Sequence, residues 1–266
     1  MFGGLYAPLF NECGMEPEEH VVLFSTGASS ALAAERVLQK HKATLLFTDT
    51  QFEDEDNYRF LHDVLKYFDN QKYCFNFVHI KEGRNPLQIF EDEGVLGCDR
   101  IPVCSRILKS EQTVTWLKTR KKSIILYFGF DYKELHRAER VTKRYAELGV
   151  QCAFPLCEKP FLSISARQYI ENTWKVKAPR MYDMQFAHAN CGGRCVRGKL
   201  QHWRHLLRVW PDRYKEMEEF EANFKEGKYT FLKGYSLKKL REEYEQQLPL
   251  FEEEDKAQNV PCIRCV

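Results

Sequence analysis

The sequence predicts an α/β protein in which a three-layer α/β/α domain with a mostly parallel sheet precedes a helical region that bears cysteines. Three observations support this fold class. Short apolar segments alternate with helical segments through the first two-thirds of the 266 residues, as they do in sheets whose parallel strands are joined by helices. Helical segments then predominate after about residue 160. Small and acidic residues follow two of the strands, at the sheet edge where such folds bind ligands.

Each expected element has a local signal. Runs rich in Val, Ile, Leu and Phe predict strands at 21–24, 43–50, 73–80, 123–130 and 151–156. Helical patterns occupy 30–40, 58–68, 105–119, 132–148, 164–174, 198–223 and 236–247. We therefore expect an α/β domain at 1–160 and a mainly helical region at 161–266, in which the stretch 248–260 is a loop or linker.

The composition excludes several classes of protein. With 44% apolar and 29% charged residues the chain is globular. Its formal charge of +2 is too balanced to indicate nucleic acid by itself, although basic groups lie at 118–122 and 194–208. Because no apolar run reaches the ~18 residues that span a bilayer and no signal-peptide pattern is present, we expect a cytoplasmic protein that does not enter membranes. In a reducing compartment, the ten cysteines indicate metal or redox chemistry.

Six small residues join the first expected strand to the first helix. Such a strand–loop–helix unit makes an anion site, because the first amides of the helix are unpaired and its dipole favours negative charge. The loop lacks the lysine of a Walker-type P-loop and the spaced glycines of a dinucleotide fold, so a tight turn that merely needs room is the alternative. The candidates for phosphate binding are Ser25, Thr26, Gly27, Ala28, Ser29 and Ser30.

An acidic segment, FTDTQFEDED, follows the second strand and is expected to face the same crevice as the small-residue loop. Asp49, next to the strand end, is a candidate for holding Mg²⁺ through water, because hard cations favour oxygen ligands. Alternatively, Glu53, Asp54 and Glu55 form the N-cap and acidic first turn of the next helix, where the helix dipole favours negative charge.

The segment IPVCSRILK, at 101–109, places a cysteine and two cations where a loop becomes a helix. Arg106 and Lys109 are three residues apart, so we expect them on one helix face, suited to gripping phosphate or sulfate. Cys104, at the helix start beside Arg106, is expected to favour the thiolate and to act as a nucleophile or metal ligand. A solvated basic helix end is the alternative.

Two further cysteine pairs are spaced for chemistry. Cys191 and Cys195 form a C-x₃-C pair with two glycines between them, and Cys262 and Cys265 form a C-x₂-C pair. Together with Cys104 they supply five thiolates for one four-ligand site, and sulfur-only ligation selects zinc or an iron–sulfur cluster. Unliganded thiols are the alternative. His188, in the stretch before the first pair, is either part of the site or a capping residue.

Taken in order, these motifs resemble the phosphoadenosine-phosphosulfate (PAPS) reductase branch of the adenine nucleotide α-hydrolase, or N-type ATP pyrophosphatase, superfamily, over about residues 20 to 220. The phosphate loop of that family, SGG-x-[DT]-S, corresponds to 25–30, its NTG-like turn to 48–50, and its C-[CT]-R-x-x-K segment to 104–109. The NCGGRC run at 190–195 is similar to its cysteine region. Thr26 and Ser29 depart from the family pattern, as does the turn sequence TDT.

The resemblance implies an adenine-nucleotide-binding fold of the HUP type and a set of site residues. ATP or a related adenine nucleotide, with Mg²⁺, would bind the loop and Thr48, Asp49, Thr50, Arg106 and Lys109. A [4Fe–4S] cluster, with zinc as the alternative, would be held by Cys104, Cys191, Cys195 and either Cys262 or Cys265. The remaining terminal cysteine would be a sulfur carrier or nucleophile, so the catalytic candidates are Cys104, Cys262 and Cys265.

The function that this resemblance implies is an ATP pyrophosphatase-type adenylation followed by sulfur transfer to an acceptor. The first alternative is a sulfonucleotide (PAPS or APS) reductase that releases sulfite, although the E-C-G-[IL]-H peptide of such reductases is missing from the PCIRCV ending. The second is a non-catalytic nucleotide sensor or regulatory subunit. The implied partners are an adenine nucleotide, a nucleic acid (tRNA or DNA), a sulfur donor such as a cysteine desulfurase, and a second copy in a homodimer.

Overall fold

The computed structural model describes residues 18–96, 102–158 and 164–247. Its strands are β1 (Glu18–Leu23), β2 (Ala43–Asp49), β3 (Phe75–Lys81), β4 (Ser123–Tyr127) and β5 (Gln151–Ala153). They form one sheet in the order β3-β2-β1-β4-β5. The pairs β1–β2, β1–β4 and β4–β5 are parallel, and Val22 of β1 lies opposite both Leu45 and Tyr127. The mostly parallel sheet expected from the sequence is confirmed.

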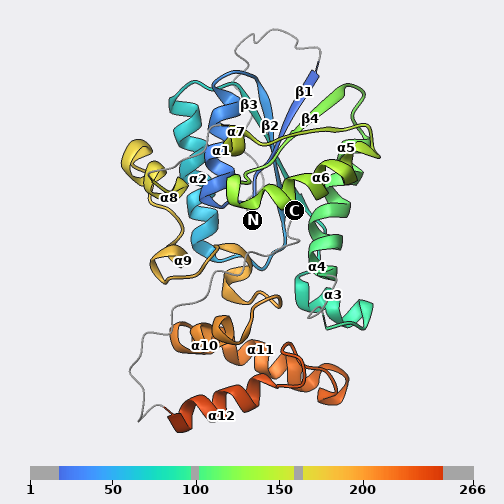
Figure 1. The fold of residues 1–266 in the computed structure, drawn as a ribbon, viewed down its shortest axis with the longest axis vertical. Coiled ribbons are helices and arrows are strands. Elements are labelled where there is room, and N and C mark those ends of the chain that lie inside the picture. The colour runs from blue at the N-terminus through green and yellow to red at the C-terminus, as the bar shows by residue number, and fades with distance from the viewer. Residues whose placement is uncertain (1–17, 97–101, 159–163, 248–266) are drawn as a thin grey trace. The chain divides into compact units, whose positions relative to one another are not determined.

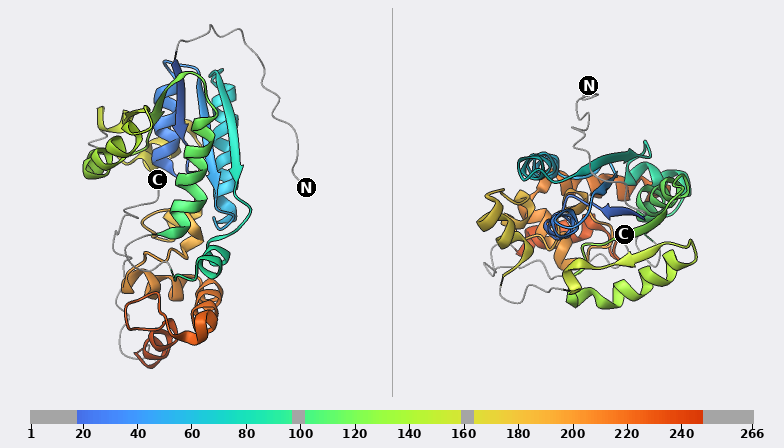
Figure 2. Two further views of the ribbon diagram at one scale, coloured as in Figure 1. Left: turned by 90° about the vertical axis from the view of Figure 1, so that its right-hand side faces the viewer. Right: turned by 90° about the horizontal axis from the view of Figure 1, so that it is seen from above.

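Helices cover both faces of this sheet, with α1 and α2 on one face and α6 on the other (Figures 1 and 2). The helices of this part are α1 (Ala28–Leu38), α2 (Glu55–Asn70), α5 (Gln112–Lys118), α6 (Leu135–Ala146), α7 (Pro155–Glu158) and α8 (Ala166–Tyr169), with the short turns η2 (Tyr132–Glu134) and η3 (Ile170–Trp174). Because β1 is covered on both faces, its central residues Val21 and Val22 are fully buried, and such strands have continuous apolar sequences.

The chain forms two compact units, each assembled from several segments. Within the described ranges, the first consists of 18–48, 58–80 and 115–178, and contains most of the sheet. The second consists of 49–57, 81–114 and 179–247. These units cut across the boundary near residue 160 that the sequence predicts, because the acidic segment and the Cys104 segment group with the C-terminal helices.

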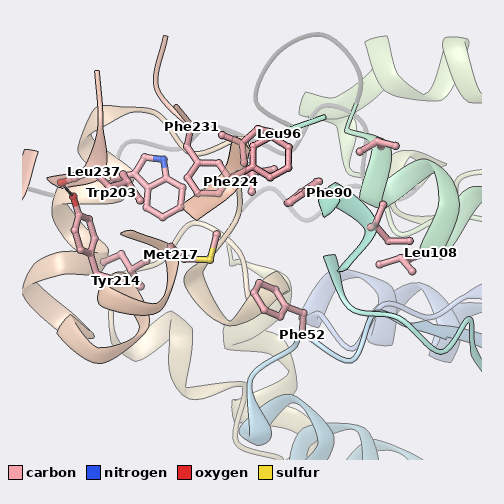
Figure 3. Close-up of a cluster of buried hydrophobic side chains, with 14 of the residues drawn as sticks. Phe52, Phe90, Leu96, Leu108, Trp203, Tyr214, Met217, Phe224, Phe231 and Leu237 are labelled. Carbon is pink, nitrogen blue, oxygen red and sulfur yellow. Dashed lines mark hydrogen bonds between the residues drawn. The ribbon is translucent and has the colours of Figure 1, made fainter. Parts of the chain in front are cut away.

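The second unit is built from short helices around an aromatic core (Figure 3). Its helices are α3 (Pro86–Glu93), α4 (Val103–Ser105), η1 (Arg106–Glu111), α9 (Arg180–Asp183), η4 (Asn190–Gly193), α10 (Leu200–Val209), α11 (Pro211–Asn223), η5 (Phe224–Gly227) and α12 (Leu237–Gln247). Trp203, Tyr214 and Met217 are fully buried in this core beside Phe52 and Phe90. The Tyr214 hydroxyl donates to the Leu237 carbonyl at 2.7 Å. The expected helical, cysteine-bearing region is confirmed.

One expected helix is divided in the structure and one helix is additional, each for a local reason. Pro211 divides the expected helix at 198–223, because Trp210 before it leaves the helical conformation (φ −140°, ψ 69°). Helix α3 was not expected, yet Asn85 forms a capping box at its start and Gly94 ends it with φ 63°. No helix in the described ranges is both long enough and apolar enough to cross a membrane.

Candidate functional site

The loop between β1 and α1 is tied together by its own side chains. Helix α1 begins at Ala28 behind Gly27, and no side chain caps its start. The Ser30 hydroxyl accepts a hydrogen bond from the Ser25 N–H (3.2 Å) and donates one to the Gly27 carbonyl (2.9 Å). The Ser30 hydroxyl therefore shapes the loop, whereas the sequence suggested it as a supplementary phosphate donor.

Thr26 holds two unfavourable features in this loop. Its backbone is left-handed, with φ 58°, which costs a residue with a side chain roughly 1–2 kcal/mol. Its side chain is fully buried, and its hydroxyl oxygen has no hydrogen-bond partner. A buried, unpartnered hydroxyl costs free energy, and strained residues often gather at ligand sites. Thr26 is therefore the least satisfied residue of this loop.

The same loop lies at the point where the sheet changes direction. From β1 the chain proceeds to β2 and β3 on one side, and later to β4 and β5 on the other. Gly129, just after β4, touches the start of α1: a Cβ at this position would lie 2.8 Å from Ser30 Cα and N. Open α/β sheets bind ligands beyond the carboxyl ends of the strands at this switch point, so the loop is in the position expected of a phosphate site.

The turn after β2 is held by local contacts. The Asp49 carboxylate is buried, accepts a hydrogen bond from the Gln51 N–H at 2.8 Å, and lies 3.5 Å from the Lys81 ammonium. The Thr50 hydroxyl donates to Glu53 Oε1 at 3.3 Å. Thr48 is half-buried at the end of β2. Magnesium and nucleotide binding at this turn remain predictions.

Glu53 connects the acidic segment to the cysteine turn. Its Oε2 atom accepts a hydrogen bond from the Cys191 N–H at 2.6 Å, and its Oε1 atom lies 3.5 Å from the Lys109 ammonium. Burial lowers the pKa of Lys109, but the charges of Glu53, Cys191 and Cys104 outweigh this effect and raise it. Glu53 therefore neutralises a buried cation while it fixes the backbone of a cysteine.

Asp54 makes a second connection to the same turn. Its fully buried carboxylate pairs with Arg180 (2.8 Å) and Arg213 (2.6 Å), and Arg213 also donates to the Gly192 carbonyl at 2.8 Å. Burial raises the pKa of Asp54, but the hydrogen bonds from the two arginines outweigh it and hold the pKa below its ordinary value. Asp54 also accepts from the Asp56 N–H at 3.0 Å, so the alternative of an acidic helix start is correct for this residue.

Three cysteines come together beside these acidic residues. Cys191 and Cys195, at the two ends of the NCGGRC turn, share a hydrogen bond, and Cys104 lies close enough for the charge of Cys195 to act on it. The hydrogen bond from Cys191, helped by the His188 ring, holds the pKa of Cys195 well below its ordinary value. The structure thus brings together the three described cysteines that the sequence proposed as ligands.

The expectation that Cys104 favours the thiolate form is wrong. Burial, followed by the charge of Cys195, raises the pKa of Cys104 to about 12. Arg106, the neighbouring cation, pairs with Glu111 and Glu93 instead of the thiol. The thiol with the depressed pKa is Cys195.

Arg106 and Lys109 do not share a helix face. The segment η1 is a π-helix, in which hydrogen bonds join residues five apart and residues three apart diverge. Arg106 is exposed with its two glutamate partners, whereas the side chain of Lys109 is 10% exposed and faces Glu53. Arg106 and Lys109 are therefore not placed to bind the same phosphate group. A role of either residue in nucleotide binding remains a prediction.

Sequence reasoning missed three residues that shape the thiol site. His202 is buried and contacts the Gly193 carbonyl through Nε2 at 2.8 Å, and burial lowers its pKa to about 4. Arg180 and Arg213 hold Asp54. The acidic segment could have indicated the two arginines, because a carboxylate that becomes buried requires a cation or hydrogen-bond donors as partners.

Metal binding at the thiols remains a prediction. In the described part of the chain, no three His, Cys, Asp or Glu side chains are arranged so that they could hold a metal ion. The terminal candidates Cys262 and Cys265 lie outside the described residues. Nucleic acid binding is also untested, and Arg194 of the second basic group is engaged by Glu216 at 2.6 Å and by the ring of Phe52.

These features define an α/β protein with a loop of small residues at its switch point and a buried group of thiols. No protein-family model matches the chain, and no curated protein matches it. Among solved structures, the fold is similar to that of a phosphoadenylyl-sulfate (PAPS) reductase from Candida auris in a phosphate complex, with a TM-score of 0.42 and 13% identity over 64% of this chain and 78% of that chain. At this level the likeness concerns the course of the backbone alone.

Proposed function

We propose that this chain is a PAPS-reductase-like enzyme that uses an adenine nucleotide to activate an acceptor and then passes sulfur to it. The observation that carries this proposal is the loop from Ser25 to Ser30. It lies at the switch point of the sheet, precedes a helix without a side-chain cap, and encloses the unpartnered hydroxyl of Thr26. An oxyanion of a nucleotide phosphate would satisfy both the helix start and that hydroxyl.

The first step would be adenylation. An oxygen of the acceptor attacks the α-phosphorus of ATP, the bond to the β-phosphate oxygen breaks, and pyrophosphate leaves with Mg²⁺. The amides at the start of α1 would stabilise the charge that develops on the phosphates, because they are fixed in place before the reaction. The product is an acceptor whose oxygen carries AMP and can depart with it.

The second step would be sulfur transfer. The outer sulfur of a cysteine persulfide, loaded by a donor protein such as a cysteine desulfurase, attacks the activated carbon, and AMP leaves with the oxygen. A second thiol then attacks the cysteine sulfur, which releases the thiolated acceptor and leaves a disulfide. The carrier of the persulfide would be whichever of the terminal cysteines Cys262 and Cys265 does not hold the cluster.

A [4Fe–4S] cluster is part of this proposal because thiolates are the donors that such clusters use, although the three described thiols are not arranged as a metal site in this structure. Cys104, Cys191 and Cys195 would hold it together with Cys262 or Cys265. When bound, the cluster would supply a sulfide or an electron-accepting centre. The residues of this chain orient the ligands: Glu53 fixes the backbone of Cys191, and Arg213 holds the Gly192 carbonyl.

Measuring pyrophosphate release from ATP by anaerobically purified protein, with and without tRNA or DNA, tests this function. Release that the nucleic acid stimulates, and that a Gly129→Ala variant loses, would support adenylation. Tight ATP binding without turnover would instead support the nucleotide sensor and overturn the enzyme. Sulfite release from PAPS or APS would support the reductase.

A further inference from the structure

The turn that carries Cys191 and Cys195 has an unusual backbone. Three residues in succession, Cys191, Gly192 and Gly193, are left-handed, with φ values of 59°, 54° and 82°. A residue with a side chain is strained in this region, so Cys191 needs outside support to remain there. The reversal brings the Cys191 and Cys195 side chains into hydrogen-bond contact although three residues separate them.

That support comes from three neighbours that bind the backbone of the turn. Glu53 accepts the Cys191 N–H at 2.6 Å, Arg213 donates to the Gly192 carbonyl at 2.8 Å, and His202 contacts the Gly193 carbonyl at 2.8 Å. Every left-handed residue of the turn therefore has one peptide group held by a buried or half-buried side chain. The turn is preorganised, and the two sulfurs are presented as a pair.

We propose that Cys191 and Cys195 form a redox-active dithiol that cycles between two thiols and an intramolecular disulfide. This goes beyond the proposed function, because it needs neither a nucleotide nor an acceptor. It applies to the chain without a bound cluster, because thiolates that hold iron cannot pair with each other, and it therefore differs from the ligand role proposed above for both residues. Both are free thiols in this structure, and their side chains are already in hydrogen-bond contact, as the closing of a disulfide requires.

The difference in solvent exposure between the two cysteines determines which of them reacts first with a disulfide. Cys191 is half-buried and Cys195 is 5% exposed, so a small disulfide reaches Cys191 first. The Cys191 sulfur, as the thiolate, attacks one sulfur of the disulfide, and the other sulfur leaves as a thiolate that takes up the Cys191 proton. The Cys195 sulfur then attacks the Cys191 sulfur in the same way and expels the second thiolate, which takes up the Cys195 proton. Two thiols of the chain are oxidised and one disulfide is reduced.

The sequence makes this proposal easy to test, because Arg194 separates the two cysteines. The purified full-length chain is equilibrated with oxidised and reduced glutathione, the remaining thiols are alkylated, and the protein is digested with trypsin. Cys191 then lies in peptide 181–194 and Cys195 in peptide 195–197. We expect these two peptides to be recovered joined by a disulfide, in an amount that rises with the share of oxidised glutathione.

Three single variants separate this pairing from others. Cys191→Ser and Cys195→Ser should both abolish the linked peptides, and the Cys195→Ser variant should accumulate a glutathione adduct on peptide 181–194. Cys104→Ser should leave the linked peptides unchanged. Recovery of peptide 195–197 joined to 101–106, or full alkylation of both cysteines in oxidised glutathione, would overturn the proposal. Neither result would bear on adenylation, since no ATP is present.

Discussion

The side chain of Glu53 and the backbone of Cys191 are joined by a 2.6 Å hydrogen bond across 138 positions of the sequence. The same carboxylate faces the buried Lys109 ammonium at 3.5 Å. The Glu53 carboxylate therefore neutralises the buried Lys109 ammonium and also holds the strained backbone of Cys191.

Removing this carboxylate should therefore be costly. We expect Glu53→Ala to lower the free energy of unfolding by about 3 kcal/mol, because Lys109 would remain buried without a partner. Urea unfolding followed by circular dichroism measures the effect. Glu55→Gln, an exposed neighbour on the same segment, should change it by less than about 0.5 kcal/mol. Equal losses in the two variants would contradict the role given to Glu53.

Asp54 should make stability depend on acid pH. Its folded pKa lies below its unfolded value because Arg180 and Arg213 hold the charged form. Its stabilisation is therefore complete above about pH 4 and is lost as the pH falls through the folded pKa. We expect Asp54→Asn to cost about 2–4 kcal/mol at pH 7 and to flatten the fall in stability below pH 4. A parallel acid dependence in both proteins would refute this assignment.

Thr26 should show opposite effects on stability and binding. Thr26→Val removes a buried hydroxyl without a partner, so we expect the nucleotide-free chain to gain about 1 kcal/mol of stability. If that hydroxyl meets phosphate, ATP affinity should fall about tenfold. Calorimetric titration and thermal unfolding measure the two quantities. Thr26→Ser keeps the hydroxyl and should bind ATP like the natural chain, whereas unchanged affinity in Thr26→Val would place the hydroxyl outside the site.

Gly129 should be intolerant of any side chain. A Cβ would lie 2.8 Å from backbone atoms of Ser30, which cannot move without displacing the start of α1. We expect Gly129→Ala to cost about 1–3 kcal/mol and to weaken ATP binding. Gly149→Ala is the control: its Cβ would meet nothing within 4 Å, although its φ of +69° remains strained. That variant should lose about 1 kcal/mol and bind ATP normally.

Metal analysis tests the proposed cluster. Protein purified without oxygen should contain iron and acid-labile sulfide, and should absorb visible light. Cys195→Ser should lose both, because it removes one of the three described thiols that would hold the cluster. Zinc without sulfide would rule out the cluster, and Cys152→Ser, a half-buried thiol in the other unit, serves as the matched control.

The sheet could be predicted from the sequence because buried parallel strands such as β1 and β2 have unbroken apolar sequences. The start of α3 could also have been recognised, since Asn85, Pro86 and Gly94 are strong boundary signals. The position of Lys109 could not, because a π-helix changes which residues share a face and its sequence looks like any other helix. Nor could the cations that pair with Glu53 and Asp54, which come from segments more than fifty residues away.

The interleaving of the two units has a consequence for how the protein is made. The ribosome releases the acidic segment and the 81–114 segment long before the C-terminal helices that complete their unit. Until then, Ile89, Phe90 and Leu108 lack the core that buries them. Glu53 and Asp54 likewise lack their partners in the cysteine turn and the arginines that pair with them. A nascent chain that stalls after residue 178 has every segment of the first unit but exposes apolar surface of the second, and such surfaces attract chaperones and aggregate. The last third of the chain therefore buries apolar side chains that were synthesised earlier. A truncation in this region should make the protein aggregate.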